Sequence, residues 1–218
     1  MKWIDGFKIF EANDVDNNSL KRSDRLLTDA QRRYEDNKTE DTSGPSPAMF
    51  FSDVVGSSAM WSNDPKTMDM QLDKHFELMD SLARKHGGFV VKTIGDAFMV
   101  YFEKNEKSLE NAVDFAVEVI KNEKLQLRIG ICSGKMTAKK CRIQNVTLLD
   151  FFGDVVNTAS RMESKVAETS SIAFTSVDDI SSQIKSLSKK YKGLVKIDGP
   201  SLPDLKGVKV PFAYKIRV

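Results

Sequence analysis

Apolar and polar positions follow two different periods along residues 48–132, and each change of period marks a new element. Short apolar runs predict strands, whereas apolar residues three and four positions apart predict helices. The pattern predicts a strand at 48–53, a helix at 65–86, a hairpin at 88–102, a helix at 106–122 and a strand at 125–132. This β-α-β-β-α-β order is typical of a ferredoxin-like sandwich, in which two helices cover one sheet. The predicted fold class is therefore α+β.

The first helix shows the clearest pattern. Its apolar positions keep helical spacing: Met68, Leu72, Phe76, Met79 and Leu82. Pro65 suits its first turn and Gly87-Gly88 suits its end. His75 and His86 lie on this helix without Cys or acidic ligands at metal-binding spacing. We therefore expect both histidines at the surface or at the helix end.

The pattern beyond residue 132 predicts an extension of the sandwich. Residues 135–149 have little helical period and carry several basic side chains, which favours a protruding β arm. The remaining predicted elements are a helix at 154–163, a strand at 171–175, a polar surface helix at 177–190 and strands at 193–198 and 210–217. One folded domain is therefore expected over residues 46–218.

Residues 1–45 differ in composition from the rest of the chain. They are rich in Asp, Asn, Lys and Arg, and they close with a linker-like segment at 42–47. A weak apolar stripe predicts a helix at 20–36, and apolar residues among the first ten suit docking onto another surface. We expect a partly ordered arm, with a regulatory or dimer-contacting segment as the alternative.

Composition narrows the classes of function. A formal net charge of +2 over 218 residues gives no case for nucleic acid or a membrane surface as partner. Cys132 and Cys141 lack the spacing of a zinc site or disulfide framework, so reduced thiols in a cytosol are expected. No apolar run reaches membrane-spanning length, and the first residues do not resemble a signal peptide. A cytoplasmic protein without direct membrane insertion is expected, with any attachment made through a partner.

Two carboxylates stand at the ends of predicted strands. Asp53 ends the strand at 48–53, and Asp96 lies at the turn of the hairpin, where Gly95 supplies backbone freedom. Small residues at 54–58 follow Asp53, and their amides suit a phosphate. Each piece alone is more typical of an ordinary turn, but together they indicate two-metal chemistry on a nucleotide. Both carboxylates are expected to face solvent.

Asp53 and Asp96 belong to two of four sequence motifs. The motifs are Phe51-Ser52-Asp53-Val54-Val55-Gly56-Ser57, Lys92-Thr93-Ile94-Gly95-Asp96, Arg128-Ile129-Gly130-Ile131-Cys132-Ser133-Gly134 and Asp150-Phe151-Phe152-Gly153-Asp154-Val155-Val156-Asn157-Thr158-Ala159-Ser160-Arg161-Met162. In this order and spacing they resemble the catalytic domain of class III nucleotidyl cyclases. The resemblance is strong over residues 46–165 and weaker over 193–218.

The resemblance implies a head-to-tail homodimer whose active sites are each built from both chains. Asp53 and Asp96 match the family's two metal carboxylates, and the Val54 carbonyl would be a further ligand of two Mg²⁺ or Mn²⁺ ions. One ion would lower the pKa of the ribose 3′-hydroxyl, and the other would hold the triphosphate.

The resemblance also implies substrate-binding roles. The same chain would contribute Phe51, phosphate-binding amides from Val55, Gly56, Ser57 and Ser58, and the phosphate-contacting Arg128. The partner chain would contribute Asn157 to orient the ribose and Arg161 to stabilise charge on the α-phosphate; their spacing of four places them on one helix face. Lys206 would contact the terminal phosphates, with Lys209 close enough to compete for this assignment.

Lys92 and Asp150 match the two positions that read the base. Lysine only donates hydrogen bonds and an ionised aspartate only accepts them, which suits the Watson–Crick edge of adenine. Guanylyl cyclases resemble this pattern with an acidic residue in place of the lysine and a small polar one in place of the aspartate. Cytosine presents the same polarity as adenine, so a pyrimidine cyclase stays open as an alternative.

The predicted function is adenylate cyclase, which forms 3′,5′-cyclic AMP and pyrophosphate from ATP. Two further classes stay open. A cyclase-homology domain could bind nucleotide and only regulate a partner, and a palm-type polymerase or diguanylate cyclase shares a ferredoxin-like core with paired carboxylates. The turn at 93–96 lacks the extra glycine and acid of diguanylate cyclases.

Overall fold

The computed structural model describes residues 2–4, 7–9, 45–143 and 146–218. The chain divides into two compact units, Met1–Thr42 and Ser43–Val218. In the first unit, strands β1 (Lys2–Ile4) and β2 (Phe7–Ile9) pair antiparallel. The predicted helix at 20–36 lies outside the described residues.

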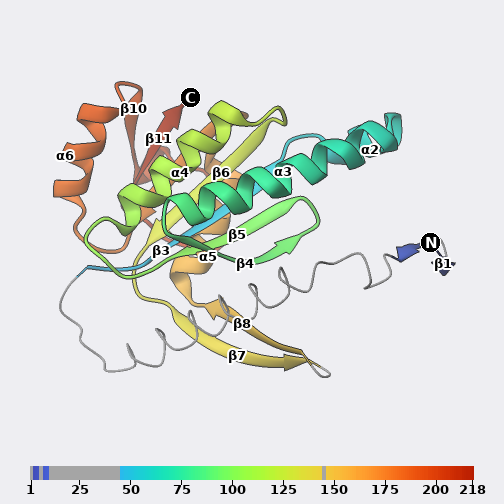
Figure 1. The fold of residues 1–218 in the computed structure, drawn as a ribbon. Helices are drawn as coiled ribbons and strands as arrows, with labels where there is room; N and C mark the ends of the chain where they lie inside the picture. Colours follow the sequence, from blue (N-terminus) through green and yellow to red (C-terminus); the bar gives the residue numbers. More distant parts are fainter. Residues whose placement is uncertain (1, 5–6, 10–44, 144–145) are drawn as a thin grey trace. The chain divides into compact units, whose positions relative to one another are not determined.

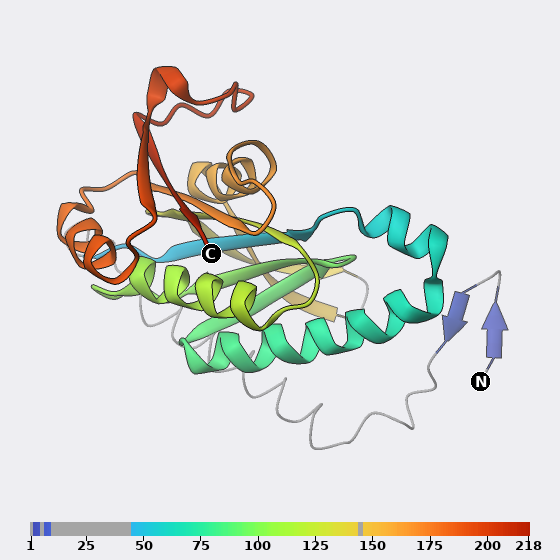
Figure 2. The same cartoon turned by 90° about the horizontal axis from the view of Figure 1, so that it is seen from above.

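The second unit contains the predicted sandwich (Figure 1). Its central strands are β3 (Ala48–Val54), β4 (Gly88–Ile94), β5 (Ala97–Phe102) and β6 (Leu127–Ser133). They lie in the order β6-β3-β5-β4, and each neighbouring pair is antiparallel. Helices α3 (Pro65–Lys85) and α4 (Ser108–Asn122) cover one face (Figure 2). The ferredoxin-like α+β prediction is confirmed.

The C-terminal elements widen this same sheet. Strand β9 (Ser171–Ser176) pairs parallel with β6, β11 (Phe212–Arg217) pairs antiparallel with β9, and β10 (Leu194–Asp198) forms the edge. In the sequence, helix α6 (Ser181–Lys190) connects β9 to β10, and a short 3₁₀ turn (Gly199–Ser201) lies between β10 and β11. The described part of the chain thus forms a seven-stranded sheet.

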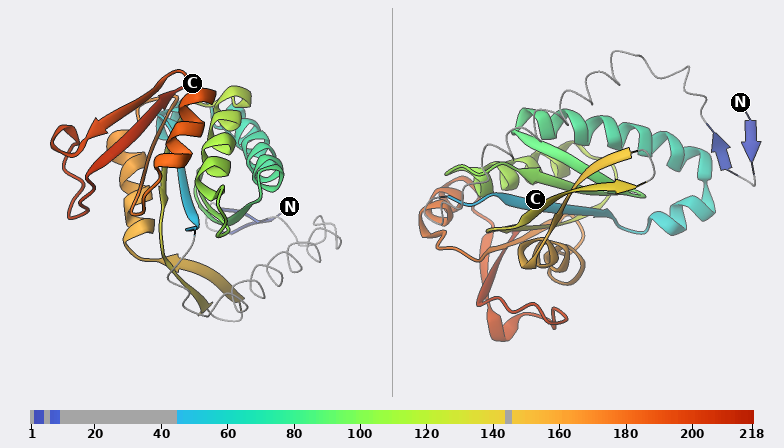
Figure 3. Two further views of the ribbon diagram at one scale, coloured as in Figure 1. Left: turned by 90° about the vertical axis from the view of Figure 1, so that its left-hand side faces the viewer. Right: turned by 90° about the horizontal axis from the view of Figure 1, so that it is seen from below.

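The predicted β arm is a hairpin of β7 (Thr137–Ile143) and β8 (Val146–Phe152). Figure 3 shows it projecting from the main sheet. The arm ends at Phe152 and not at 149, because β8 continues through Asp150 in register with β7. Asp150 is therefore held by a strand.

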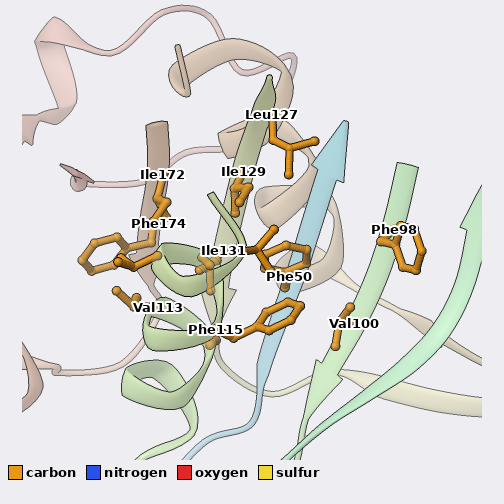
Figure 4. Close-up of a cluster of buried hydrophobic side chains, with 14 of the residues drawn as sticks. Phe50, Phe98, Val100, Val113, Phe115, Leu127, Ile129, Ile131, Ile172 and Phe174 are labelled. Atoms are coloured by element: carbon orange, nitrogen blue, oxygen red, sulfur yellow. The ribbon is translucent and has the colours of Figure 1, made fainter. Parts of the chain in front are cut away.

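The main core lies between the sheet and its helices (Figure 4). Alternate residues of β3 and β6, among them Phe50, Ile129 and Ile131, are fully buried there, and Phe50 packs edge-on against Phe115 of α4 with ring centroids 4.9 Å apart. Because strand side chains alternate between faces, Asp53, Arg128 and Gly130 turn to the opposite face of the sheet.

Helix α5 (Asp154–Arg161) covers that opposite face and continues as a π-helical turn, η2 (Met162–Val166) (Figure 2). Gly130 permits its close approach to β6. A methyl group at Gly130 would lie 2.1 Å from the backbone nitrogen of Glu163 and 2.2 Å from the carbonyl oxygen of Ala159. Both obstacles are backbone atoms, so only glycine fits while α5 keeps this position.

We expect Gly130→Ala to lower the free energy of unfolding by about 1–3 kcal/mol, the usual cost of overpacking. Urea denaturation of the purified chain measures this change. Gly193→Ala is the matched control, since a methyl group there meets its nearest neighbour, the Arg217 carbonyl, at an ordinary 3.7 Å. Equal stability of both variants would contradict the close approach of α5 to β6.

The first helix of the sandwich begins and ends as expected, with one correction. Asp64 caps α3 by accepting a 3.1 Å hydrogen bond from the Thr67 amide, and Gly87 follows the helix with φ 74°. His75, however, is fully buried, with Nδ1 2.6 Å from Oε2 of Glu123. The expectation of a surface histidine at 75 is wrong, because the ring fills the core against Phe98. His86 does lie at the helix end, as its C-cap.

Candidate active site

The two strand-end carboxylates lie at the same end of neighbouring strands. Asp53 follows Ser52, which pairs with Phe98 of β5, and Asp96 lies in the turn that precedes Ala97. This turn has only two residues, and Gly95 occupies its first position with φ 64°. Glycine at that position is typical of a tight hairpin turn. The predicted role of Gly95 is therefore confirmed.

The surroundings of the two carboxylates differ. Asp53 accepts a 2.6 Å hydrogen bond from Nη2 of Arg128, the residue opposite it on β6, and its side chain is 33% exposed. Oδ2 of Asp96 is buried and has no hydrogen-bond partner among the described residues. The expectation that both carboxylates face solvent is therefore wrong for this oxygen, although Asp96 as a whole is half-buried.

This arrangement fits a divalent cation. A buried carboxylate oxygen without a donor is costly unless something charged binds it. Among the described residues, no group of three or more His, Cys, Asp and Glu side chains is placed to hold a metal ion. A cation at Asp53 and Asp96 would therefore complete its shell with other oxygens, such as the Val54 carbonyl and a substrate phosphate.

Arg128 lies between Asp53 and a second carboxylate that the sequence analysis missed. Its Nε is 3.1 Å from Oε1 of Glu163, on the π-helical turn η2. Burial raises the pKa of Glu163 to about 7; the charge of Asp53 adds to this shift and the charge of Arg128 opposes it. No local pattern marks Glu163, because only the packing of η2 on β6 brings it to Arg128.

The small-residue segment after Asp53 forms a tight turn into a short helix. Gly56 has φ 76° and precedes helix α2 (Ser57–Asn63), a helix that the sequence analysis did not predict. The amide of Val55 donates a 2.8 Å hydrogen bond to the carbonyl of Gln126. This amide is therefore engaged within the chain, and the phosphate contacts at Gly56, Ser57 and Ser58 stay a prediction.

Lys92 and Asp150 are brought into direct contact. Nζ of Lys92 donates a 2.6 Å hydrogen bond to Oδ2 of Asp150, and these side chains are 42% and 20% exposed. A β-bulge between Val90 and Lys92 changes the register of β4 immediately before Lys92. Bulges re-aim side chains. Beside this pair, Phe151 stacks on Tyr101 with ring centroids 4.4 Å apart, which fixes the base of the β7–β8 hairpin on β5.

The other predicted residues stay separate from these groups. Asn157 is exposed on α5 and Arg161 is half-buried at its end. Lys206 is exposed in the β10–β11 connection, in a left-handed conformation with φ 51°. Among the described residues, no side-chain hydrogen bond or ion pair joins Asn157, Arg161 or Lys206 to Asp53, Asp96, Lys92 or Asp150. Phe51 lies on β3 between Met99 and Gly130.

The protein-family model named adenylate and guanylate cyclase catalytic domain matches residues 41–204 of this chain. Among similar curated proteins, an adenylate cyclase of Neurospora crassa is 31% identical over 181 residues, which cover 72% of this chain and 8% of that protein. A receptor-type guanylate cyclase of Caenorhabditis elegans is 32% identical over 132 residues, which cover 53% of this chain and 12% of that protein. The chain spans between 8% and 15% of the length of these first relatives.

Solved structures show the same fold. A guanylate cyclase domain from Catenaria anguillulae in complex with GTP superposes with a TM-score of 0.65 at 28% identity, covering 79% of this chain and 96% of that one. An adenylyl cyclase from P. aeruginosa superposes with a TM-score of 0.63 at 23% identity, covering 79% of this chain and 93% of that one. The sandwich, its arm and its C-terminal strands therefore define a cyclase fold.

The chain belongs to the family of adenylate and guanylate cyclase catalytic domains, the class III nucleotidyl cyclases. Domains of this class bind nucleotide, act as dimers and generally depend on divalent metal. This assignment decides against the palm-type polymerase and diguanylate cyclase alternatives. No helix among the described residues is both long and apolar enough to cross a membrane.

Proposed function

We propose that this domain is an adenylate cyclase. In this reaction the ribose 3′-oxygen of ATP attacks the α-phosphorus, the bond to the bridging oxygen of the β-phosphate breaks, and 3′,5′-cyclic AMP and pyrophosphate form. The observation that carries the proposal is the 2.6 Å contact between Lys92 and Asp150. The 31% identical Neurospora crassa protein, named an adenylate cyclase, supports it.

The pair suits adenine because of what each group can do. Lys92 donates to the acceptor ring nitrogen, and Asp150 accepts from the exocyclic amino group. Guanine presents an acceptor and donors in the opposite sense, so each side chain would face a group of the wrong polarity. Leaving such groups unpaired against the wrong base costs on the order of 10⁴-fold in discrimination. In the absence of a base, Lys92 and Asp150 satisfy one another.

The remaining chemistry is divided between two chains in this proposal. The first chain binds the triphosphate through Arg128 and the amides after Gly56, and Asp53 and Asp96 hold the cations. Bound divalent cations lower the pKa of the 3′-hydroxyl and neutralise the triphosphate. The partner chain places Asn157 at the ribose and Arg161 at the α-phosphate, where a preorganised donor stabilises the developing charge.

Two features of the surface support a site shared between chains. Cavities of about 240 and 610 Å³ lie among the described residues, and none of the proposed site residues lines either of them. Neither Lys92 nor Asp150 therefore lies in one of these two cavities. Two large apolar side chains near the site, Ile94 and Phe152, are 65% and 43% exposed. Exposed apolar groups of this size suit a surface that another chain covers.

Guanylate cyclase is the second candidate function. Several similar proteins are named guanylate cyclases, and the matched Catenaria anguillulae domain is in complex with GTP. The Lys92–Asp150 pair is the observation that separates the two candidates in this chain.

We expect kcat/KM for ATP to exceed that for GTP by several orders of magnitude, because both Lys92 and Asp150 would be mispaired against guanine. The measurement compares ATP, GTP, CTP and UTP on one preparation with Mn²⁺ in excess, and identifies cyclic products chromatographically. The double change Lys92→Glu and Asp150→Cys is expected to erode this preference. Equal turnover of GTP and ATP by the unaltered protein would overturn the assignment of adenine, and absence of every cyclic product would favour a regulatory cyclase-homology domain.

A further inference from the structure

Arg128 is shared unequally between two carboxylates. Its Nη2 makes a 2.6 Å hydrogen bond to Asp53, whereas its Nε approaches Oε1 of Glu163 at 3.1 Å. The second contact is an ion pair without hydrogen-bond geometry, and among the described residues neither of these two buried atoms has a hydrogen-bond partner. The guanidinium therefore bonds to Asp53 through Nη2 and makes only a longer ion pair with Glu163 through Nε.

Glu163 is the most enclosed member of this group. Its side chain is 11% exposed, against 33% for Asp53 and 35% for Arg128. A buried carboxylate oxygen that lacks a hydrogen bond lowers stability. The backbone contact at Gly130 holds Glu163 in this place, since the nitrogen of Glu163 lies directly over that glycine. The fold thus holds a buried carboxylate beside Arg128, and one of its oxygens accepts no hydrogen bond among the described residues.

A cation bound at Asp53 would change how Arg128 divides its contacts between Asp53 and Glu163. A divalent ion bound to Asp53 repels the guanidinium of Arg128, which weakens the hydrogen bond between Arg128 and Asp53. Arg128 then needs another counter-charge if it is to stay at the site. Glu163 lies within ion-pair distance, so re-aiming the guanidinium would convert the 3.1 Å contact into a charge-assisted hydrogen bond.

We propose that Glu163 is a positioning residue that takes Arg128 from Asp53 when a divalent cation binds there. This inference rests on the proposed function, because it assumes that Asp53 and Asp96 hold the cation. Arg128 neutralises Asp53 in the metal-free domain and moves to Glu163 in the metal-bound domain. Held in that way, its outer nitrogens remain free for a phosphate.

The proposal predicts an effect on metal binding that needs no turnover. In Glu163→Gln, Asp53 is the one charged partner left to Arg128 among the described residues, so Arg128 competes more strongly with the cation. We expect Mn²⁺ to bind roughly three- to tenfold more weakly, the coupling typical of residues in one ion-pair network. Electron paramagnetic resonance of free Mn²⁺, at a pH above the Glu163 pKa of about 7, measures this affinity. Thermal unfolding without metal checks that the variant is folded.

A double-mutant cycle separates positioning from direct action on the metal. If Glu163 acts through Arg128, Glu163→Gln has no effect on Mn²⁺ affinity in an Arg128→Met background. A loss of the same size in both backgrounds would show that Glu163 acts on the cation itself and would overturn the proposal. The matched control is Glu168→Gln, an exposed carboxylate paired with Lys215 and Arg217 that should leave Mn²⁺ affinity unchanged.

The same measurements distinguish failure of this inference from failure of the proposed function. If Asp96→Asn weakens Mn²⁺ binding but Glu163→Gln does not, the metal site stands and the positioning role is wrong. If the unaltered domain binds no Mn²⁺, or Asp96→Asn leaves its affinity unchanged, the assumed metal site is wrong and the inference falls with it.

Discussion

Asp96→Asn is expected to reduce cyclase turnover roughly 1,000-fold, the upper end of the loss for one preorganised electrostatic group. The substitution keeps the size of the side chain and removes the charge that would bind a cation. The structure also predicts that the fold is unharmed. Among the described residues Oδ2 of Asp96 is buried without a hydrogen-bond partner, so the substitution breaks no hydrogen bond at that oxygen. Turnover of ATP with saturating Mn²⁺ and thermal unfolding without metal measure the two effects.

Asp80→Asn is the matched control for this prediction. Asp80 lies on α3, is 49% exposed and pairs with Arg84 one turn away. Exposed pairs of this kind contribute little to stability, so activity and unfolding should both stay unchanged. Near-normal turnover in Asp96→Asn would remove this residue from the metal site. A collapse of stability would mean that the carboxylate has a structural partner.

A mixture of two inactive variants, Asp96→Asn and Arg161→Ala, is expected to recover activity. Each lesion lies in a different half of the proposed site, so a heterodimer has one site with neither lesion and one site with both. Random exchange makes about half the dimers heterodimers with one intact site of two, which gives roughly a quarter of the unaltered activity. Among the described residues of one chain, no side-chain hydrogen bond or ion pair joins Arg161 to these carboxylates, which motivates this prediction. Activity of the mixture against total protein concentration measures it.

Mixing Asp96→Asn with Asp53→Asn is the control, because both lesions lie in the same half and every site in every dimer stays damaged. Recovery in this control would show that the assay detects something other than site sharing. Absence of recovery in the first mixture, with exchange demonstrated by differently tagged chains, would mean that each site is built within a single chain.

Local periodicity determined the elements of the catalytic unit and their order. Spacings of three and four located α3 and α4, and short apolar runs located β3 and the β4–β5 hairpin. The placement of Asp53 and Asp96 at strand ends followed from the same pattern, because a strand ends where its apolar run meets polar residues. The contact between Lys92 and Asp150 agrees with their pairing in the family resemblance.

Only the tertiary structure decided how these elements bury or expose particular atoms. The π-helical turn at η2 brings Glu163 over Gly130, the β7–β8 hairpin brings Asp150 to Lys92, and the core encloses His75. Each outcome depends on packing between segments far apart in the chain; the Lys92–Asp150 bond, for example, spans 58 positions. Sequence patterns report which face of an element is apolar, and the identity of the atoms opposite that face is set only when the elements pack together.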